Sequence, residues 1–452
     1  MADLNKQSES GSRWVCQPEA WSFLQDRLQQ FCEWNPVISD WRDRLLKQTG
    51  TRLVDWIDHL TLREVDVSAD QLVRLGFQFS SDREGWCHTQ GLFPTIRRPE
   101  DDGEVGLAMK VQSVDDFCSL HETQDSSPLG AVTDLRMIAV QRSPDATFWV
   151  VERHGNPGRV PALVTDAQRQ MIVDGTQLLR DRSRVDGQAG FDHARQVFDV
   201  VASKLGRDWA CDLFFSTERD YWQDRNHAAR IQKQRQDALG VGWANHDHHT
   251  YRCSRENFRS IVSVLEHFGF ECRERFYAGA QAGWGAQVLE HSQCGLVIFA
   301  DVDLSPDEVA GDFAHLGLET RESLGTVGLW CKLHGDSFLA AGMHHLECQF
   351  DFDAVRTQLA EQGIETMAPF TDFKFLRQAF TVGERWEIRS GRLEQMVERR
   401  WITREQAQEF SEQGAIGSHL EILERNDGYK GFNQTGVSDI IHRTDPRLQA
   451  SK

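Results

Sequence analysis

Two short stretches, Asp58-His59-Leu60-Thr61-Leu62-Arg63 and Asp247-His248-His249-Thr250-Tyr251-Arg252, share the pattern Asp-His-x-Thr-x-Arg. Each stretch alternates as a β-strand does. Each is followed by a helix-like segment and then by a Gly-Phe element, Leu-Gly-Phe at 75–77 and Phe-Gly-Phe at 268–270. A strand, a helix and further strands that recur in this order predict tandem copies of one fold.

The spacing of apolar residues divides the chain into helical and mixed segments. Residues 1–50 place apolar side chains three and four positions apart, which predicts an N-terminal helical segment. Residues 158–240 predict a helical connector, including one long helix over 221–239. Residues 51–157 and 241–452 mix short strands with single helices, so we expect an α+β chain with two mixed modules.

Composition narrows the classes of partner. The chain has 452 residues and a net charge of −19, which works against binding to a phosphate backbone, so no nucleic-acid partner is expected. No apolar run of membrane-spanning length and no signal-peptide pattern occur, so no membrane association is expected. The ten cysteines form no Cys-x-x-Cys pair, and we expect a reduced, cytoplasmic protein without a zinc ribbon.

Several metal-binding residue types fall in predicted strands. Period-2 alternation puts His248 and Arg252 on the same face of their strand. A later predicted strand carries His344 and His345, and another carries Glu421. Two histidines and one carboxylate from different strands form the facial triad that binds non-haem Fe(II) and leaves positions for substrate and O2. Since the chain has 17 histidines, the spacing alone also fits ordinary core or surface histidines.

Three stretches in a fixed order carry a family resemblance. They are an Asp-His strand with an arginine four residues after the histidine (Asp247, His248, Arg252), a histidine strand followed by a helix and a glycine turn (His344, His345, Gly363), and a Glu-x-x-Glu-Arg strand followed by Asp-Gly-aromatic and Phe-Asn elements (Glu421, Glu424, Arg425, Asp427, Gly428, Tyr429, Phe432, Asn433). With them, residues 241–442 resemble the vicinal-oxygen-chelate-type metalloenzymes of the 2-oxoadipate dioxygenase/decarboxylase (hydroxyglutarate synthase) family.

The resemblance implies a fold and a set of site residues. The fold is tandem vicinal-oxygen-chelate-like βαβββ modules that form half-open mixed β-barrels, with residues 241–452 as the catalytic domain. His248, His345 and Glu421 become the ligands of Fe(II) or another divalent metal. Arg252 becomes the catalytic residue that binds a substrate carboxylate, because guanidinium pairs bidentately with that group.

Two neighbouring residues are weaker candidates. His344 is expected to face away from His345, so that only one of the two histidines ligates the metal, and which one stays open. Glu424 faces away from Glu421 and is expected to pair with an arginine.

The N-terminal module reads as a partial copy of the metal site. His59, Arg63 and Glu152 hold the first and last motif positions, and the middle strand at 107–112 has no histidine. Two ligands bind Fe(II) poorly, so we expect residues 51–157 to be a degenerate, structural module.

The implied activity is that of an Fe(II)-dependent dioxygenase/decarboxylase. Its partners are O2 and a small 2-oxo acid such as 2-oxoadipate, which would give a 2-hydroxy acid such as 2-hydroxyglutarate and CO2. The alternatives are another metalloenzyme of this fold (an extradiol-type dioxygenase, an isomerase or a lyase) and a non-catalytic protein that binds a small ligand. No glycine-rich phosphate-binding motif supports a nucleotide enzyme.

Overall fold

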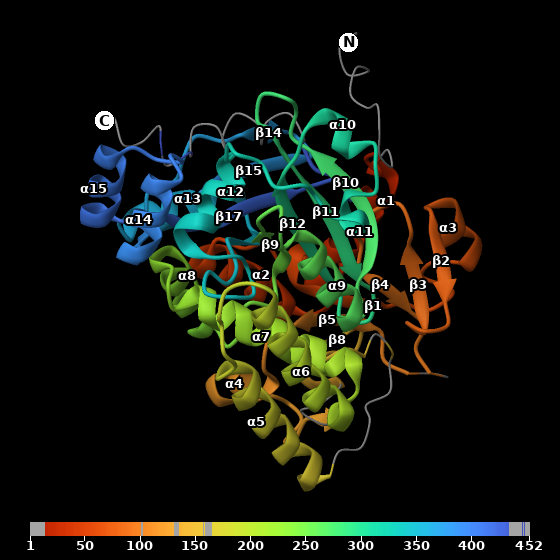
Figure 1. The fold of residues 1–452 in the computed structure, drawn as a ribbon. Coiled ribbons are helices and arrows are strands. Elements are labelled where there is room, and N and C mark those ends of the chain that lie inside the picture. Colours follow the sequence, from red (N-terminus) through yellow and green to blue (C-terminus); the bar gives the residue numbers. More distant parts are fainter. Residues whose placement is uncertain are drawn as a thin grey trace.

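The computed structural model describes residues 14–100, 103–130, 135–156, 158, 165–433, 445 and 447. These residues form two mixed β-sheets with helices around them (Figure 1). Strands of the second sheet, green to blue, lie in the upper half of the view, and the connector helices lie below them. Within the described residues, no helix is long and apolar enough to cross a membrane.

The first sheet consists of two βαβββ units. Its elements are β1 (Ile57–Thr61), α3 (Ala69–Arg74), β2 (Phe77–Ser80), β3 (Gly85–His88), β4 (Thr95–Arg97), β5 (Gly106–Lys110), α4 (Val114–Leu120), β6 (Leu129–Gly130), β7 (Leu135–Arg142) and β8 (Thr147–Arg153). The strands lie in the order β2-β3-β4-β1-β5-β8-β7-β6. The two units therefore meet at the antiparallel pair β1 and β5.

The second sheet repeats this plan. Its elements are β9 (His246–Arg252), α9 (Phe258–Phe268), β10 (Glu271–Tyr277), β11 (Trp284–His291), β12 (Leu296–Asp303), β13 (His345–Gln349), α13 (Phe352–Glu361), β14 (Thr371–Phe373), β15 (Leu376–Phe380), β16 (Glu384–Trp386) and β17 (Ala415–Arg425). The strands lie in the order β10-β11-β12-β9-β13-β17-β15-β14, with β16 beside β17. The expected α+β fold of paired βαβββ units in half-open mixed sheets is confirmed.

Strand register confirms the internal repeat in detail. His59 lies opposite Ala108, and His248 lies opposite Glu347. In both strand pairs the register shifts at the aspartate before the histidine, so this aspartate has no partner across the ladder. A bulge of this kind re-aims the side chain that it carries. The Asp-His pattern therefore marks equivalent bulges in the two sheets.

The remaining helices flank and connect the sheets. They are α1 (Pro18–Trp34), α2 (Pro36–Thr49), the 3-10 turn η1 (Leu53–Trp56), α5 (Asp166–Arg180), α6 (Gln188–Leu205), α7 (Arg207–Gln223), α8 (His227–Asp237), α10 (Pro306–Val309), α11 (Phe313–Leu316), α12 (Thr326–His334), α14 (Ser390–Glu398) and α15 (Arg404–Gln413). The prediction of one helix over 221–239 is wrong. Helix α7 ends at Gln223, and Asn226 caps α8 by accepting the Ala229 N–H at 2.9 Å.

The largest apolar core orients strand β9. His249 and Tyr251 of β9 face aromatic side chains of α7, with the Phe215 ring 5.7 Å from His249 and 6.0 Å from Tyr251. Because side chains alternate along a strand, His248 and Arg252 turn to the opposite, inner face of the sheet. Helix α12 covers that face, and its Trp330 donates a hydrogen bond to a carbonyl of β17.

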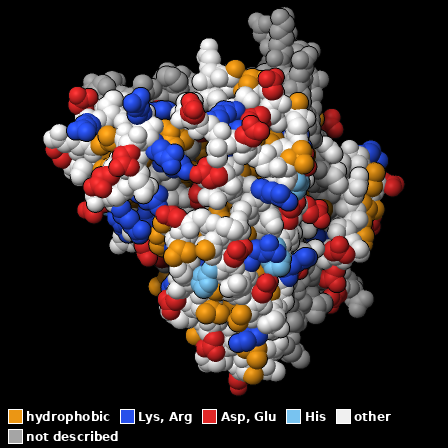
Figure 2. Space-filling view, in the orientation of Figure 1, with side chains coloured by type: hydrophobic (Ala, Val, Ile, Leu, Met, Phe, Trp, Pro, Cys, Tyr) orange, Lys and Arg blue, Asp and Glu red, His pale blue; other side chains and the backbone are white. Residues whose placement is uncertain are grey.

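Charged side chains of both signs lie interspersed on the face of the molecule that Figure 2 shows. The net charge of −19 is thus not gathered into one acidic surface there. This mixture of charges favours solubility over attraction of one kind of polyion to this face.

A histidine links the first sheet to the connector. His154 lies between Glu152 of β8, 2.7 Å away, and Asp212 of α7, 2.6 Å away. Burial opposes the charged imidazole, but the carboxylates of Asp212 and Glu152 outweigh it and raise the pKa of His154 to about 10. A protonated His154 therefore joins the two parts through charge-assisted hydrogen bonds.

We expect His154→Gln to lower the free energy of unfolding by about 3 kcal/mol at pH 6. The folded pKa is raised, so this stabilisation is fully present below the unfolded pKa of about 6.5 and is lost as pH rises toward 10. Urea unfolding at pH 6, 7.5 and 9, with His193→Gln of α6 as the control, measures the difference. A difference that grew with pH would contradict this assignment.

Candidate functional site

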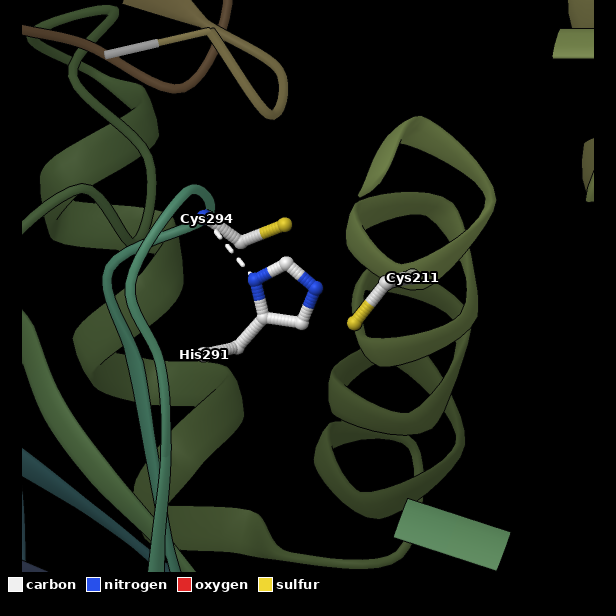
Figure 3. A group of neighbouring side chains, drawn as sticks. All are labelled: Cys211, His291 and Cys294. Atoms are coloured by element: carbon white, nitrogen blue, oxygen red, sulfur yellow. Dashed lines mark hydrogen bonds between the residues drawn. The ribbon is translucent and has the colours of Figure 1, made fainter. Parts of the chain in front are cut away.

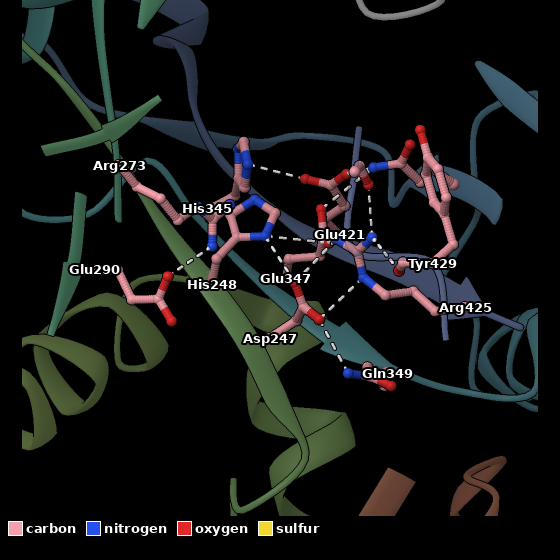
Figure 4. A network of polar contacts seen from close by, with 12 residues as sticks. Asp247, His248, Arg273, Glu290, His345, Glu347, Gln349, Glu421, Arg425 and Tyr429 are labelled. Atoms are coloured by element: carbon pink, nitrogen blue, oxygen red, sulfur yellow. Dashed lines mark hydrogen bonds and ion pairs between the residues drawn. The ribbon is translucent and has the colours of Figure 1, made fainter. Parts of the chain in front are cut away.

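The three predicted metal ligands lie together on the inner face of the second sheet (Figure 4). His248 comes from β9, His345 from β13 and Glu421 from β17, which are neighbouring strands. One donor atom from each side chain lies within 4.8 Å of the other two, and all three residues are buried. The closest pair is His345 Nε2 and Glu421 Oε2, at 2.9 Å.

His248 is oriented by a buried carboxylate. Its Nδ1 lies 3.1 Å from Asp247 Oδ1, and Arg425 holds the same carboxylate at 3.1 and 3.2 Å. Burial opposes protonation, but Glu347 and Asp247 raise the pKa of His248 to about 10. A metal ion would displace the Nε2 proton of this imidazolium, while Nδ1 continues to donate to the carboxylate as in carboxylate–histidine–metal arrangements.

Glu347 is a site residue that the sequence reasoning missed. In the sheet register it lies opposite both His248 and Glu421. Its Oε1 is 3.1 Å from His248 Nδ1, and burial together with the Glu421 carboxyl raises the pKa of Glu347. The available signal was its place two residues after His345, on the same strand face. Gln378 of β15 donates a hydrogen bond of 3.1 Å to Glu421.

His344 also lines the inner cavity, so the expectation that it faces away from His345 is wrong. The strand begins at His345, and strict alternation does not extend to the residue before it. The two rings lie 5.2 Å apart. His344 Nδ1 pairs with the Gly417 carbonyl at 2.9 Å, and it is His345 that shares the 4.8 Å group with His248 and Glu421.

Arg252 lies in the same cavity as the predicted ligands. Its Nε has no hydrogen-bond partner among the described residues, and burial lowers the pKa of the guanidinium. Asp301 lies opposite Arg252 in β12, and burial raises the pKa of this carboxyl to about 8. The side chain of Arg252 is therefore available to an anion that enters the cavity.

The cavity itself is small, about 50 Å³, and largely walled by aromatic rings. These are Phe276, Trp284, Phe299, Phe370, Phe380 and Phe432. The Phe432 ring packs 5.2 Å from the His248 ring and 4.5 Å from Phe299. Such walls exclude water, which strengthens electrostatic interactions inside.

The equivalent place in the first sheet holds no comparable set of ligands. Sheet register matches His345, Glu347 and Glu421 with Gly106, Ala108 and Trp149, respectively. A Cβ on Gly106 would lie 2.6 Å from the Trp149 ring, so the indole occupies this space.

Other residues of the first module also depart from the expected site. Glu152 corresponds in register to Glu424 rather than to Glu421, so its expected place as the last motif residue is corrected. Glu152 accepts the Val114 N–H at the start of α4. Arg63 is exposed beyond the end of β1 and pairs with Asp66.

Glu424 has the same role in the second sheet that Glu152 has in the first. It accepts the Phe352 N–H at the start of α13 and lies 3.6 Å from Arg52. The pairing of Glu424 with an arginine is thus present. In both sheets, the glutamate near the end of the last strand therefore binds the first turn of the helix in the same βαβββ unit.

The residues on the inner face fit a divalent metal ion. Two imidazoles and one carboxylate are a donor set typical of non-haem Fe(II) and related ions. His345 Nδ1 is buried without a hydrogen-bond partner within the described part of the chain. Glu347 and Glu421 bring two carboxyl groups together, and the nearest arginine, Arg425, is 3.7 Å from Glu347. A cation would offset this buried negative charge.

Comparisons with known proteins add likenesses of fold. No protein-family model matches the chain, and no curated protein matches it. Among solved structures, a triple mutant of 4-hydroxymandelate synthase from Streptomyces coelicolor is 12% identical, covers 75% of this chain and 96% of its own, and has a TM-score of 0.28. The Mn(II)-bound glyoxalase from Novosphingobium aromaticivorans is 10% identical, covers 82% of both chains, and has a TM-score of 0.19.

A third solved structure is the uncharacterized protein YdcJ from Shigella flexneri, which includes domain DUF1338. It is 11% identical, covers 63% of this chain and 84% of its own, and has a TM-score of 0.25. The fold assignment rests on the strand order and pairing of this chain.

We expect Arg425→Met to destabilise the metal-free protein by about 3–5 kcal/mol, because it removes the buried arginine that pairs with the Asp247 carboxylate. Arg153→Met is the matched control, since Arg153 pairs with Asp58 at the equivalent place but is 19% exposed. Its loss should be smaller. Urea unfolding in the presence of a chelator measures both variants, and equal losses would contradict the special burial of the Asp247 pair.

Proposed function

We propose that the chain is a non-haem Fe(II)-dependent dioxygenase that decarboxylates a 2-oxo acid, with 2-oxoadipate as the first substrate to test. The observation that carries the proposal is the convergence of His248, His345 and Glu421 beside Arg252 in one cavity. A two-histidine, one-carboxylate set leaves positions where a 2-oxo acid chelates through its keto and carboxylate oxygens. Bound Fe(II) would supply the redox chemistry that lets O2 attack the keto carbon.

The side chains around the ligands have distinct tasks in this proposal. Asp247 holds the His248 ring so that Nε2 points toward the metal. Arg252 binds a carboxylate of the substrate and so sets which carbon lies next to the reacting oxygen. The guanidinium suits this role because the Arg252 Nε is buried and makes no hydrogen bond to any residue that the structure describes.

The aromatic walls limit the reaction to the bound acid. The Phe432, Phe299 and Phe380 rings surround the ligand side chains and keep bulk water out of the cavity. Exclusion of water protects reactive species from side reactions. In the balanced reaction, one 2-oxoadipate and one O2 give one 2-hydroxyglutarate and one CO2.

Oxygen uptake by the Fe(II)-loaded protein tests the activity directly. We expect uptake only with a 2-oxo acid present, and about one CO2 released per O2 consumed. His248→Ala and Glu421→Ala should reduce uptake by more than the roughly 10- to 100-fold that changes to supporting residues cause. His59→Ala, the equivalent histidine in the first sheet, is the matched control and should retain full activity.

Two results would reject the oxygenase. One is tight metal binding without oxygen uptake across a panel of linear and aromatic 2-oxo acids. The other is uptake that persists in both His248→Ala and Glu421→Ala. Failure of the wild-type protein to bind a divalent metal would leave a protein that binds a small ligand.

Asp247→Asn tests whether the carboxylate supports a metal ligand. We expect the variant to bind Fe(II) about 10- to 100-fold more weakly, because Nδ1 of His248 loses one of its two carboxylate acceptors, Asp247, and keeps only Glu347. Asp58→Asn changes the equivalent pair in the first sheet and should leave the affinity unchanged. Competition with a chromogenic chelator under anaerobic conditions measures both. Equal affinities in the two variants would remove Asp247 from the metal site.

Glu347 favours one second candidate, a metal-dependent isomerase. Its carboxyl lies beside Glu421 and His248 and adds a proton-carrying group that an oxygenase triad does not need. Such a group moves a proton between adjacent carbons of a metal-bound substrate. Turnover in the absence of O2, lost in Glu347→Gln, would support the isomerase and reject the oxygenase.

A further inference from the structure

A second cluster of metal-binding side chains shares no residue with the group of His248, His345 and Glu421. Cys211 is in α7, His291 is the last residue of β11, and Cys294 is in the turn between β11 and β12. One donor atom from each lies within 4.8 Å of the other two. Figure 3 shows the His291 ring between the two cysteine side chains.

Asp208, in the first turn of α7, lies beside this cluster. Its Oδ1 lies 3.6 Å from His291 Nε2, which is too long for a hydrogen bond. Both atoms are buried, and neither has a hydrogen-bond partner among the residues described. His291 is only 1% exposed. At this distance the two groups form an ion pair when His291 is protonated, and a bound cation would take the place of that proton.

The distance between Asp208 and His291 fits tetrahedral zinc. Zinc binds thiolate at about 2.3 Å and imidazole or carboxylate at about 2.0–2.2 Å, so its ligand atoms lie about 3.3–3.8 Å from one another. The 3.6 Å between Asp208 Oδ1 and His291 Nε2 falls in this range. The sequence places the donors in two short pairs, Asp208-x-x-Cys211 on one helix face and His291-x-x-Cys294 at a hairpin.

We propose that Asp208, Cys211, His291 and Cys294 bind one zinc-type divalent ion, separate from the metal at the inner face. Binding releases the thiol protons of both cysteines to solvent. His291 ligates through Nε2 and keeps its proton on Nδ1, so the long 3.3 Å contact from the Cys294 amide to Nδ1 is exchanged for the metal bond. Two thiolates select a softer ion than the two-imidazole, one-carboxylate set does.

A direct contact already joins the two elements that carry the donors. The Cys294 thiol of the hairpin donates to the Asp208 carbonyl of α7 at 3.0 Å, so helix and hairpin meet at this sulfur.

A path for the ion leads through the space between the two modules. Cys294 lines a chamber of about 840 Å³ whose walls also include Asp58 of the first sheet and Asp247 of the second. The ion therefore reaches the cluster without unfolding of the core. Once four protein ligands close around it, the site leaves no open position, as in a structural zinc centre. It links the connector helix α7 to the tip of the β11–β12 hairpin.

Cobalt substitution of the full-length protein, reduced and handled without oxygen, tests the proposal. Thiolate ligation gives Co(II) an intense sulfur-to-metal charge-transfer band, whereas the inner-face triad contains no sulfur. We expect the wild-type protein to show this band and to hold one metal equivalent that Cys294→Ser and Asp208→Asn lose. Cys118→Ser, in α4, is the matched control and should keep the band.

The two metal sites are separated by the same measurement. His248→Ala should keep the thiolate band while it loses the other metal equivalent. Cys211→Ser is a second variant of the cluster, and Cys294→Ser remains informative if that buried change impairs folding. Absence of the band in wild type, or its retention in both Cys294→Ser and Cys211→Ser, would overturn the proposal.

Discussion

A buried ion pair between Asp247 and Arg425 holds the three central strands of the second sheet in register. It joins the bulge at the start of β9 to the last residue of β17, across the intervening β13. Removing one partner of such a pair leaves an uncompensated buried charge, which costs several kcal/mol. The pair also turns Asp247 toward His248, so the same interaction fixes the strands and aims a ligand. Asp58 and Arg153 form the equivalent pair in the first sheet.

The two sheets share an Asp-His-Arg arrangement but differ in the side chains around it. In both, a bulged aspartate contacts the following histidine and an arginine at the end of a partner strand. Around this arrangement, the first sheet has Gly106 and Trp149 where the second has His345 and Glu421. An indole packed over a glycine contributes apolar burial, whereas polar donors in the same place cost desolvation unless an ion is bound. The first sheet thus has apolar packing where the second has the candidate metal ligands.

Much of the fold and part of the site followed from the sequence. Period-2 alternation placed His248 and Arg252 on one strand face, and the Asp-His-x-Thr-x-Arg repeat located both sheets. The incorrect predictions concern residues at the start of a strand or at a β-bulge. His344 stands just before β13 rather than within it, and the bulge at Asp247 carries its carboxylate around to His248. Neither feature changes the pattern of apolar residues, so alternation alone does not reveal it.

Long-range packing was also out of reach of the sequence. The Asp208, Cys211, His291 and Cys294 cluster arises because a hairpin tip rests on a connector helix, and no local period encodes that contact. Between helices α7 and α8, the cap residue Asn226 also donates a hydrogen bond to Ser418 of β17. This contact exists only once the second sheet is assembled. Local rules describe elements well, whereas contacts between distant elements need the tertiary structure.

The inner face of the second sheet forms only when β9 and β13 pair in antiparallel fashion. This pairing is the junction of two βαβββ units, and His248 belongs to one unit while His345 and Glu421 belong to the other. Neither unit contains a complete set of donors. Their assembly therefore requires closure of a very long loop, which is slow and comes late in folding. Under the proposed function, a newly made chain would gain its full metal affinity only when its last strand is in place, and ion capture would report completion of the molecule.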